Sequence, residues 1–198
     1  GGIIGIAPGT KLLSVSVGLG VESSDTDAQI AAAIIWSVDA GADVINLSLS
    51  RNSRSWPISW DNAFLYAFEN DVVVIAASGN DSDGNYRPAA PATIPGVISV
   101  TGLDRDLEAT RLSGTTGIDV TLAAPGAGLF GSYPENQIAG WSGSSAATPI
   151  VSGVVALMRA KDPEASANDI VFRLINTTRE LGCILYKSPS PRHRPRTR

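Results

Sequence analysis

The fold is decided by residues 43–49, which read Asp43-Val44-Ile45-Asn46-Leu47-Ser48-Leu49. This run is too continuously apolar for a strand with one face in water, and it suits a parallel strand that helices cover on both faces. A strand of a β-sandwich would alternate apolar and polar residues instead. We therefore expect a buried strand here, in a fold of the α/β class.

Helical patterns flank this strand on both sides. Before it, apolar residues recur at helical spacing from Thr26 onward, with Asp25 or Thr26 as the N-cap, and Gly41 ends the helix. After it, a second helix is expected from about Trp60 to Asn70, and an apolar strand over residues 72–77 follows at once. This alternation of strand and helix is typical of a parallel sheet in an α/β protein.

The rest of the chain extends the same pattern. The order of elements predicts a three-layer sandwich, with helices on both sides of a mostly parallel sheet. The remaining expected elements are strands over residues 11–17, 97–101 and 120–123, a helix over 145–160 and an amphipathic helix over 167–175.

Size and composition indicate one globular domain. The chain has 198 residues, of which 43% are hydrophobic and 17% charged, enough to form a substantial aliphatic core. The net charge is −4, but residues 187–198 contain five Lys or Arg and no acid, so the remainder carries −9. An acidic body repels nucleic acid phosphates, and a basic end of this kind is more often a solvated tail than a DNA contact. We therefore expect no nucleic acid partner.

Several other classes of protein are disfavoured. No apolar run reaches the ~18 residues of a membrane span, and no signal peptide opens the chain. No G-x-G-x-x-G enters a helix from a strand and no Gly-Lys-Ser/Thr phosphate loop occurs, which argues against a nucleotide-binding domain. The single cysteine, Cys183, excludes an intramolecular disulfide and leaves the cellular compartment open.

Two segments carry groups suited to acyl transfer. Ser144 and Ser145 lie where a glycine-rich loop enters a helix, and a helix N-terminus favours negative charge developing beside it. Asn80 follows a buried strand through Gly79, at the sheet edge where α/β proteins bind ligands, and its NH₂ group is suited to donate to an oxyanion. Taken singly, the serines also fit an N-cap and the Gly-Asn pair also fits a turn, so the residues alone leave these alternatives open.

Together these segments resemble the subtilase family of serine proteases. Residues 143–153, G-S-S-A-A-T-P-I-V-S-G, match the family's nucleophile motif G-T-S-M-A-x-P-H-V-A-G. Residues 77–80 match its oxyanion segment A-A-G-N, whereas the related sedolisins carry Asp at the position of Asn80. Flanking pieces agree in order from about Gly5 to Gly182, namely Gly5–Pro8 followed by Lys11–Leu13, the strand at 43–49, the turn at Pro91–Val97, and Ala124–Gly126.

The resemblance implies a fold and a set of site residues. The fold is a subtilisin-like α/β sandwich truncated at its N-terminal side, formed by residues 1–182 and followed by a disordered basic tail over 183–198. Ser145 is then the nucleophile, Asn80 with the Ser145 N–H binds the oxyanion, and the peptide bond before Pro91 is expected to be cis. A small apolar substrate pocket would be lined by Ser48, Leu49, Ser50, Ala76, Ala77 and Gly79, with Gly18 on the opposite wall.

The groups that would activate Ser145 are not found where the family has them. Subtilases order their triad Asp, His, Ser, and the first two belong before the Gly5–Pro8 segment, which begins only four residues into this chain. The only histidine, His193, lies in the basic tail on the wrong side of Ser145. The motif's own His and Met are Ile150 and Ala146 here.

Two functional hypotheses follow. In the first, the chain is by family a serine endopeptidase that acts on polypeptides through an acyl-enzyme on Ser145, and it is inactive in isolation. In the second, it is a non-catalytic peptide-binding remnant or pseudoenzyme. A separate chain that supplies the Asp and the His is an open alternative, and a frameshift or a truncated gene would produce both ends. A sheet that has lost strands exposes apolar groups, so we also expect poor solubility.

The resemblance also bears on metals and location. We expect no cofactor and no catalytic metal. The family's weaker cation site, for calcium or a monovalent ion, would correspond to Asp119 with the carbonyls of Ala92 and Ile94, although a single Asp in a loop usually faces water. The residues do not decide the location, whereas the family resemblance implies a secreted or cell-envelope protein.

Overall fold

The computed structural model describes residues 3–19, 25–51, 53–80, 87–109 and 119–179. The elements follow the expected alternation of helices and strands, with small shifts at their ends. In chain order they are α1 (Thr26–Asp39), β1 (Val44–Leu47), α2 (Ile58–Glu69), β2 (Val73–Ala77), β3 (Ile98–Leu103), β4 (Leu122–Pro125), β5 (Leu129–Tyr133), β6 (Gln137–Trp141), α3 (Ser144–Lys161) and α4 (Ala167–Asn176).

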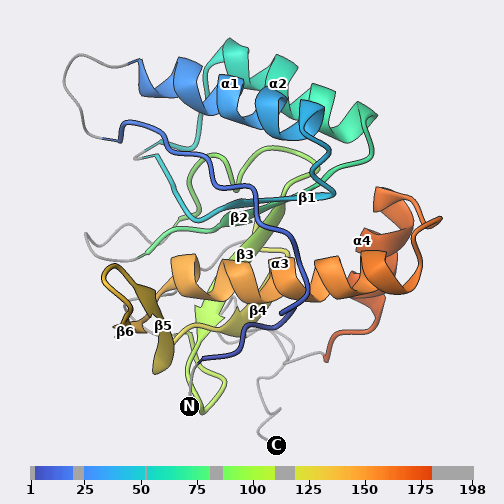
Figure 1. The fold of residues 1–198 in the computed structure, drawn as a ribbon. Coiled ribbons are helices and arrows are strands. Elements are labelled where there is room, and N and C mark those ends of the chain that lie inside the picture. Colours follow the sequence, from blue (N-terminus) through green and yellow to red (C-terminus); the bar gives the residue numbers. More distant parts are fainter. Residues whose placement is uncertain (1–2, 20–24, 52, 81–86, 110–118, 180–198) are drawn as a thin grey trace, which may run out of the picture.

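Four parallel strands form the central sheet, in the order β1-β2-β3-β4 (Figure 1). Helices α1 and α2 cover one face of this sheet, and α3 with α4 covers the other. The expected three-layer α/β sandwich with a parallel sheet is therefore confirmed. Because the strands are parallel, their carboxyl ends meet at one edge, where folds of this class place their sites.

Two aliphatic cores hold the layers together, one on each face of the sheet. Along β2, Val74 and Ala76 belong to the core under α1 and α2, and Val73 and Ile75 belong to the core under α3 and α4. All five residues of β2 are buried, as expected for an inner strand. Each aliphatic side chain of this kind contributes about 1.5–3 kcal/mol when it is fully buried.

The first strand differs from the prediction of a strand buried on both faces. Ile45 and Leu47 are buried in the core under α1 and α2, but Asn46 and Ser48 are exposed. In the described sheet β1 is an edge strand, and its second face carries polar groups toward α3, where Asn46 Oδ1 accepts from Ser152 Oγ at 2.9 Å. The alternation of apolar and polar residues from Ile45 to Ser48 predicts the burial of this strand better than the overall apolar character of the run does.

The predicted strand over residues 11–17 is wrong. These residues have no regular secondary structure, and residues 11–16 are exposed. A strand needs a neighbour for its backbone groups, and none of the described strands pairs with this segment. Instead the N-terminal segment runs across α3 (Figure 1). Ile6 of this segment lies so close to Gly153 of α3 that a side chain at position 153 would collide with it.

The antiparallel hairpin of β5 and β6 is a feature that the residue pattern did not predict. It stands beside the central sheet, between β4 and α3 in the chain (Figure 1). Glu135 and Asn136 form its turn with φ values of 62° and 59°, the left-handed conformation that hairpin turns favour. The Trp141 ring lies against Gly131 on the opposite strand. Gly131 and Ser132 interrupt the alternation in β5, and Gly140 interrupts it in β6, so the signal was weak.

Several local features agree with the prediction. Asp25 is the N-cap of α1, and its Oδ1 accepts from the N–H of Ala28 at 3.0 Å. The peptide bond between Ala90 and Pro91 is cis, as the family resemblance implied. Helix α2 begins two residues earlier than expected, at Ile58. The tail predicted over residues 183–198 lies outside the described residues.

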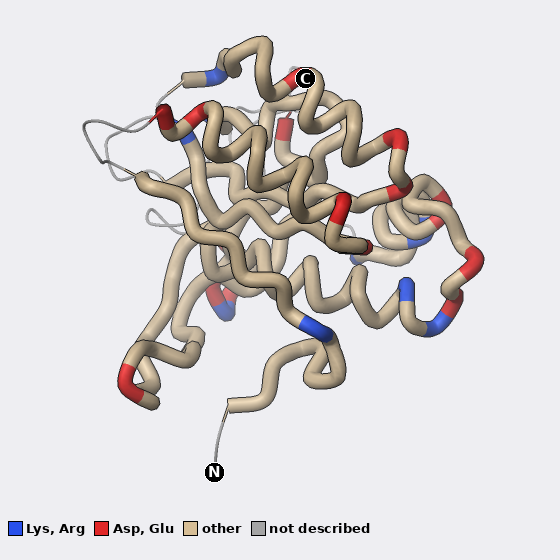
Figure 2. The backbone as a smooth tube through the Cα atoms, turned by 45° about the horizontal axis from the view of Figure 1, so that its top comes forward, with Lys and Arg blue, Asp and Glu red and all other residues tan. Residues whose placement is uncertain are grey.

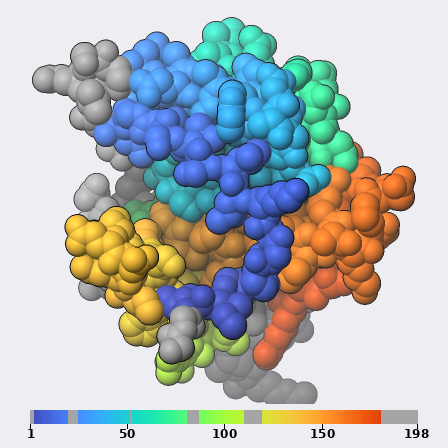
Figure 3. Space-filling model, in the orientation of Figure 1, coloured from blue at the N-terminus to red at the C-terminus, as the bar shows by residue number. Residues whose placement is uncertain are grey.

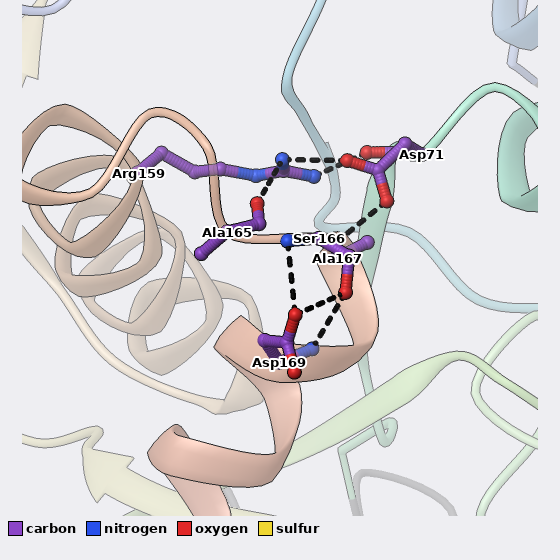
Figure 4. A network of polar contacts seen from close by, with 6 residues as sticks. All are labelled: Asp71, Arg159, Ala165, Ser166, Ala167 and Asp169. Carbon is purple, nitrogen blue, oxygen red and sulfur yellow. Dashed lines mark hydrogen bonds and ion pairs between the residues drawn. The ribbon is translucent and has the colours of Figure 1, made fainter.

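A polar network ties the end of α3 to the start of β2 and to α4 (Figure 4). Arg159 Nη1 lies 2.8 Å from Asp71 Oδ2, and the other carboxylate oxygen of Asp71 accepts from the N–H of Ala167 at 2.6 Å. Ser166 and Asp169 form a capping box at the start of α4. One carboxylate therefore connects two helices of the same layer to the central sheet.

Charge is distributed unevenly between the layers. Helices α1 and α2 carry Asp27, Asp39, Asp61 and Glu69 and contain no Lys or Arg, so this outer layer is acidic (Figure 2).

None of the helices in the described parts of the chain is both long enough and apolar enough to span a membrane.

Candidate functional site

The N-terminus of α3 lies at the carboxyl edge of the sheet, next to the ends of β1 and β2. Ser48 Oγ donates to the carbonyl of Ser145 at 2.9 Å, which joins α3 to the residues after β1. The N–H of Ser144 donates to Asn80 Oδ1 at 2.9 Å, which joins α3 to the residues after β2. The structure therefore brings together the segments that contain the predicted nucleophile, the predicted oxyanion donor and one predicted substrate wall.

Neither serine is the N-cap of α3. The N-cap is Gly143, with φ 103° and ψ 175°, and α3 begins at Ser144, one residue earlier than predicted. This conformation is accessible essentially only to glycine. A Cβ on Gly143 would also lie 2.8 Å from Asn80 Oδ1. The alternative that Ser144 or Ser145 merely caps the helix is therefore wrong.

Ser144 is a buried residue that fastens the loop after β2 to α3. Its Oγ accepts from the N–H of Gly79 at 3.2 Å and lies 2.9 Å from both the Gly79 carbonyl and Asn80 Oδ1. A hydroxyl has one proton, so it donates to one of these two acceptors at a time. Ser145 is only partly buried and presents the accessible hydroxyl of the pair.

The orientation of the Asn80 amide follows from its contact with Ser144. A backbone N–H can only donate, so the Asn80 atom that faces it at 2.9 Å must be the carbonyl oxygen. The NH₂ group at the other end of the planar amide then points away from Ser144. Because Asn80 is exposed, this donor is accessible from solvent. An accessible amide N–H of this kind is a suitable donor to a developing oxyanion.

A proline inside α3 frees the carbonyl of Ser145. In a regular helix this carbonyl would accept from the N–H of residue 149, but Pro149 has none. Ser48 Oγ donates to it instead, and Ser48 Oγ accepts from Asn46 Nδ2 at 3.0 Å. Ser152 Oγ donates to Asn46 Oδ1. The motifs alone did not predict this chain of hydrogen bonds, and a proline four residues after Ser145 was the signal that could have revealed it.

The surroundings of Ser145 favour an anion but provide no base. Among the described residues, Ser145 Oγ has one hydrogen-bond partner, the carbonyl of Ser48 at 3.4 Å. The Ser145 N–H lies in the first turn of α3, where N–H groups have no acceptor within the helix. The helix dipole adds positive potential at this end. The described residues therefore offer donors to an oxyanion but no His or carboxylate to the hydroxyl.

The residues predicted to form the substrate walls are exposed or half-buried. Ser48 and Ser50 are exposed, and Leu49 is half-buried against the core under α1 and α2. Gly18 is half-buried, and its N–H donates to Gln29 Oε1 at 2.8 Å, which fixes it to α1. The space-filling view shows a recess between the projecting hairpin (yellow) and the layer of α1 (blue), beside atoms of β1 (cyan) and α3 (brown) (Figure 3).

The remaining predicted substrate residues lie deeper. Ala76, Ala77 and Gly79 are buried at the end of β2, and the side chain of Ala76 belongs to the core under α1 and α2. Their backbone lies at the edge of the sheet that carries the site. Their role toward a substrate stays a prediction.

Asp119 does not offer a free carboxylate to a cation. Its Oδ2 lies 2.7 Å from Arg54 Nη2. Nowhere in the described ranges do three or more His, Cys, Asp or Glu side chains gather in a way that suits a metal ion. The residues present therefore do not fit a bound cation at this position.

Known proteins match this chain over most of its length, but the chain covers only part of theirs. Subtilisin DY of Bacillus licheniformis is 34% identical over 187 residues, which are 93% of this chain and 67% of that protein. Alkaline elastase YaB of Bacillus sp. (strain YaB) is also 34% identical, over 91% of this chain and 46% of that protein. The chain thus spans about half to two thirds of the length of these relatives.

Solved structures show the same fold. Fervidolysin from Fervidobacterium pennivorans, a keratinolytic enzyme related to subtilisin, superimposes with a TM-score of 0.77 at 29% identity, covering 89% of this chain and 30% of that one. The prenylagaramide maturation protease PagA gives a TM-score of 0.75 at 30% identity, covering 87% and 64%. The model of the subtilase family matches residues 1–193. On the agreement of motif, fold and family model, this chain belongs to the subtilase family.

Proposed function

We propose that Ser145 is the nucleophile of a serine endopeptidase site in which Asn80 Nδ2 and the Ser145 N–H hold the oxyanion. Membership of the subtilase family supports the reaction class, hydrolysis of peptide bonds in polypeptides. The observation that carries the assignment is the 2.9 Å bond from the Ser144 N–H to Asn80 Oδ1, because it turns the Asn80 donor outward next to Ser145. The hydroxyl of Ser144 is itself buried and has no such access.

The proposed reaction proceeds through an acyl-enzyme. Ser145 Oγ attacks the substrate carbonyl carbon, its proton passes to a base, and the carbonyl oxygen becomes an oxyanion held by the two N–H donors. Collapse of this intermediate expels the amine, which takes up the proton, and water then hydrolyses the ester on Ser145. Removing one oxyanion donor lowers kcat by about 10²–10³-fold, a value that comes from subtilisin, a member of this family.

The isolated chain is expected to turn over slowly or not at all. A serine hydroxyl needs an adjacent base, and the described residues place no His or carboxylate within hydrogen-bond distance of Ser145 Oγ. The only histidine of the sequence, His193, lies outside the described residues. The same observation favours a second function, a peptide-binding cleft without chemistry. A base supplied by a separate chain would restore the first.

The substrate is proposed to bind between Gly18 and residues 48–50, above the alanines at 76 and 77. Support comes from the hydrogen bonds that join Ser48 to Ser145 at the carboxyl edge of the sheet, and the small side chains suit an apolar substrate residue. A secreted or cell-envelope location is proposed on the family resemblance, and fractionation of the native source would check it.

Labelling with a serine-reactive fluorophosphonate, located by mass spectrometry of tryptic peptides, tests the nucleophile on the full 198-residue chain. In a parallel series, imidazole at high concentration serves as the missing base. We expect labelling at Ser145 that increases with imidazole, and we expect Ser145→Ala to abolish it. Ser132→Ala, which removes an exposed hydroxyl from the hairpin, is the matched control and should label like the wild type.

The outcomes separate the two functions. Labelling of a different residue, or undiminished labelling of Ser145→Ala, would contradict the assignment of the nucleophile. No labelling and no hydrolysis of a chromogenic apolar peptide, combined with saturable binding of a fluorescent apolar peptide, would support the binding cleft. Absence of both labelling and binding would overturn both functions.

A further inference from the structure

Arg54 joins three segments that are far apart in the sequence. Its Nη2 lies 2.7 Å from Asp119 Oδ2, and its Nη1 donates to the carbonyl of Pro88 at 3.4 Å. Its own carbonyl accepts from Thr93 Oγ1 at 2.8 Å. Arg54 therefore connects its own segment, which follows β1, to the segment that leads into β3 and to the segment that leads into β4.

These contacts lie next to the proposed substrate wall. The N–H of Arg51 donates to the carbonyl of Ala90 at 2.8 Å, and the N–H of Ala90 donates to the carbonyl of Ser53 at 2.9 Å. Arg51, Ser53 and Arg54, which follow the wall closely in the chain, are thus hydrogen-bonded to residues between 88 and 93. Whatever holds Arg54 in place also steadies this wall.

A bound cation would be another way to hold these segments together, and it would compete with Arg54 for the charge of Asp119. Asp119 is the one carboxylate that the family resemblance assigns to a cation site here. Its oxygen is already in contact with a guanidinium of unit positive charge, so a metal ion beside it would meet like-charge repulsion. The fold family implies an ion at this point, and the residues of this chain supply a side chain instead.

We propose that Arg54 is the resident cation of this site, so that the chain needs no metal ion to hold the three segments. One guanidinium balances one carboxylate, whereas Ca²⁺ is usually surrounded by six to eight oxygens that include several carboxylates. A site vacated by Arg54 would therefore suit a monovalent ion, Na⁺ or K⁺, rather than Ca²⁺. The proposal does not depend on catalysis by Ser145.

Thermal unfolding in matched salts tests this on the full chain. Melting temperatures are measured by Trp fluorescence in NaCl, KCl, CaCl₂ and choline chloride at equal ionic strength, for the wild type and for Arg54→Ala. We expect the wild type to melt at the same temperature in all four salts. Arg54→Ala should melt about 2–4 °C lower in choline chloride and regain at least half of this difference in NaCl or KCl.

Three further variants make the result decisive. Arg54→Ala combined with Asp119→Ala should lose the recovery in NaCl and KCl, because the carboxylate that would bind the ion is gone. Arg54→Lys retains a positive charge and should stay insensitive to the salt, which keeps the test valid if Arg54→Ala does not fold. Arg105→Ala, which removes an exposed Arg elsewhere, corrects for general salt effects.

Two results would overturn the proposal. One is an equal loss for Arg54→Ala in every salt, which is the behaviour of an ordinary surface ion pair. The other is a cation-specific rise in the melting temperature of the wild type that Asp119→Ala removes, because an ion would then bind beside Arg54.

Discussion

At the scale of single residues, Gly143 is a position of the site that leaves no room for a side chain. Its φ of 103° with ψ of 175° strains any other residue, and a Cβ would lie 2.8 Å from Asn80 Oδ1. We expect Gly143→Ala to lower the free energy of unfolding by roughly 2–4 kcal/mol, from backbone strain and overpacking together. Urea-induced unfolding followed by Trp fluorescence would measure it.

Gly128 provides the control for this prediction. Its φ is also positive, 65°, but a Cβ there meets nothing within 4 Å. Gly128→Ala should therefore cost only about 1–2 kcal/mol, the usual penalty for a left-handed residue with a Cβ. Equal losses in the two variants would show that the contact with Asn80 is not what makes Gly143 necessary.

Motif spacing predicted which residues of the site lie together, but not what each of them contacts. Asn80 and the serines of α3 meet as expected, because the carboxyl ends of parallel strands share one edge with the start of the following helix. The division between a buried Ser144 and an accessible Ser145 depends on hydrogen bonds to residues that are distant in the sequence. The pairing of Asp119 with Arg54 depends on the path of two loops. No local pattern encodes either contact.

At the scale of elements, the network around Asp71 makes the docking of α4 sensitive to pH. Burial alone would raise the pKa of Asp71, but hydrogen bonds from the Ala167 N–H and from Arg159, with the charge of Arg159, lower it below its ordinary 3.8. The hydroxyl and backbone N–H of Ser166 lower the pKa of Asp169 in the same way. The folded state therefore binds these protons less readily than the unfolded state.

The sign of the pH dependence follows. A carboxyl whose pKa is lower in the folded state contributes stability that is fully present above its pKa in the unfolded chain, about 3.9. This stability is lost as the pH falls through the pKa of the folded state. We expect the melting temperature to fall steeply below about pH 4. Asp71→Asn should flatten this dependence, because one of the carboxylates that must be protonated is gone. Circular dichroism between pH 5 and 2.5 would measure both.

The same variant should be less stable at neutral pH. Arg159, whose side chain is 11% exposed, would lose its charged partner, at a cost of roughly 1–3 kcal/mol. Asn is the appropriate replacement because it tolerates the left-handed φ of 61° at this position. Glu69→Gln, an exposed acid at the end of α2, is the control. A loss as large in Glu69→Gln would mean that net charge, rather than the network, explains the effect.

Elements with a strong periodic pattern of apolar residues were predictable from the sequence, whereas elements that depend on pairing with another strand were not. Helices α1 to α4 and strands β2 and β3 follow from apolar spacing that burial enforces. Residues 11–17 have the composition of a strand but no described strand to pair with, so the local preference is overridden. The hairpin forms in spite of a weak pattern, because each of its strands supplies the partner of the other.

At the scale of the whole molecule, apolar side chains are exposed along the N-terminal segment. Ile4 and Leu12 are 81% and 88% exposed, and β1 is one of the two edge strands of the described sheet. Exposed apolar groups next to an open strand edge promote association between chains. We expect the isolated chain to be an oligomer or aggregate, measured by size-exclusion chromatography with light scattering.

Replacing Ile4 and Leu12 together by Lys should shift the population toward the monomer. Leu65→Lys, which removes an exposed leucine from α2 on the opposite side of the sheet, should leave the association unchanged. A monodisperse wild-type monomer that melts cooperatively would contradict the prediction, and would mean that the N-terminal segment covers the edge well enough by itself.

The hydroxyl of Ser48, which substitutes for the backbone donor that Pro149 lacks, has a consequence for how this family varies. A proline at position 149 leaves the carbonyl of residue 145 unpaired wherever position 48 has no donor. Where position 149 has its own N–H, this carbonyl no longer needs a donor at position 48. Descendants of one ancestor should therefore exchange these two residues together, and a correlation between the two columns would be the inherited trace of a single hydrogen bond.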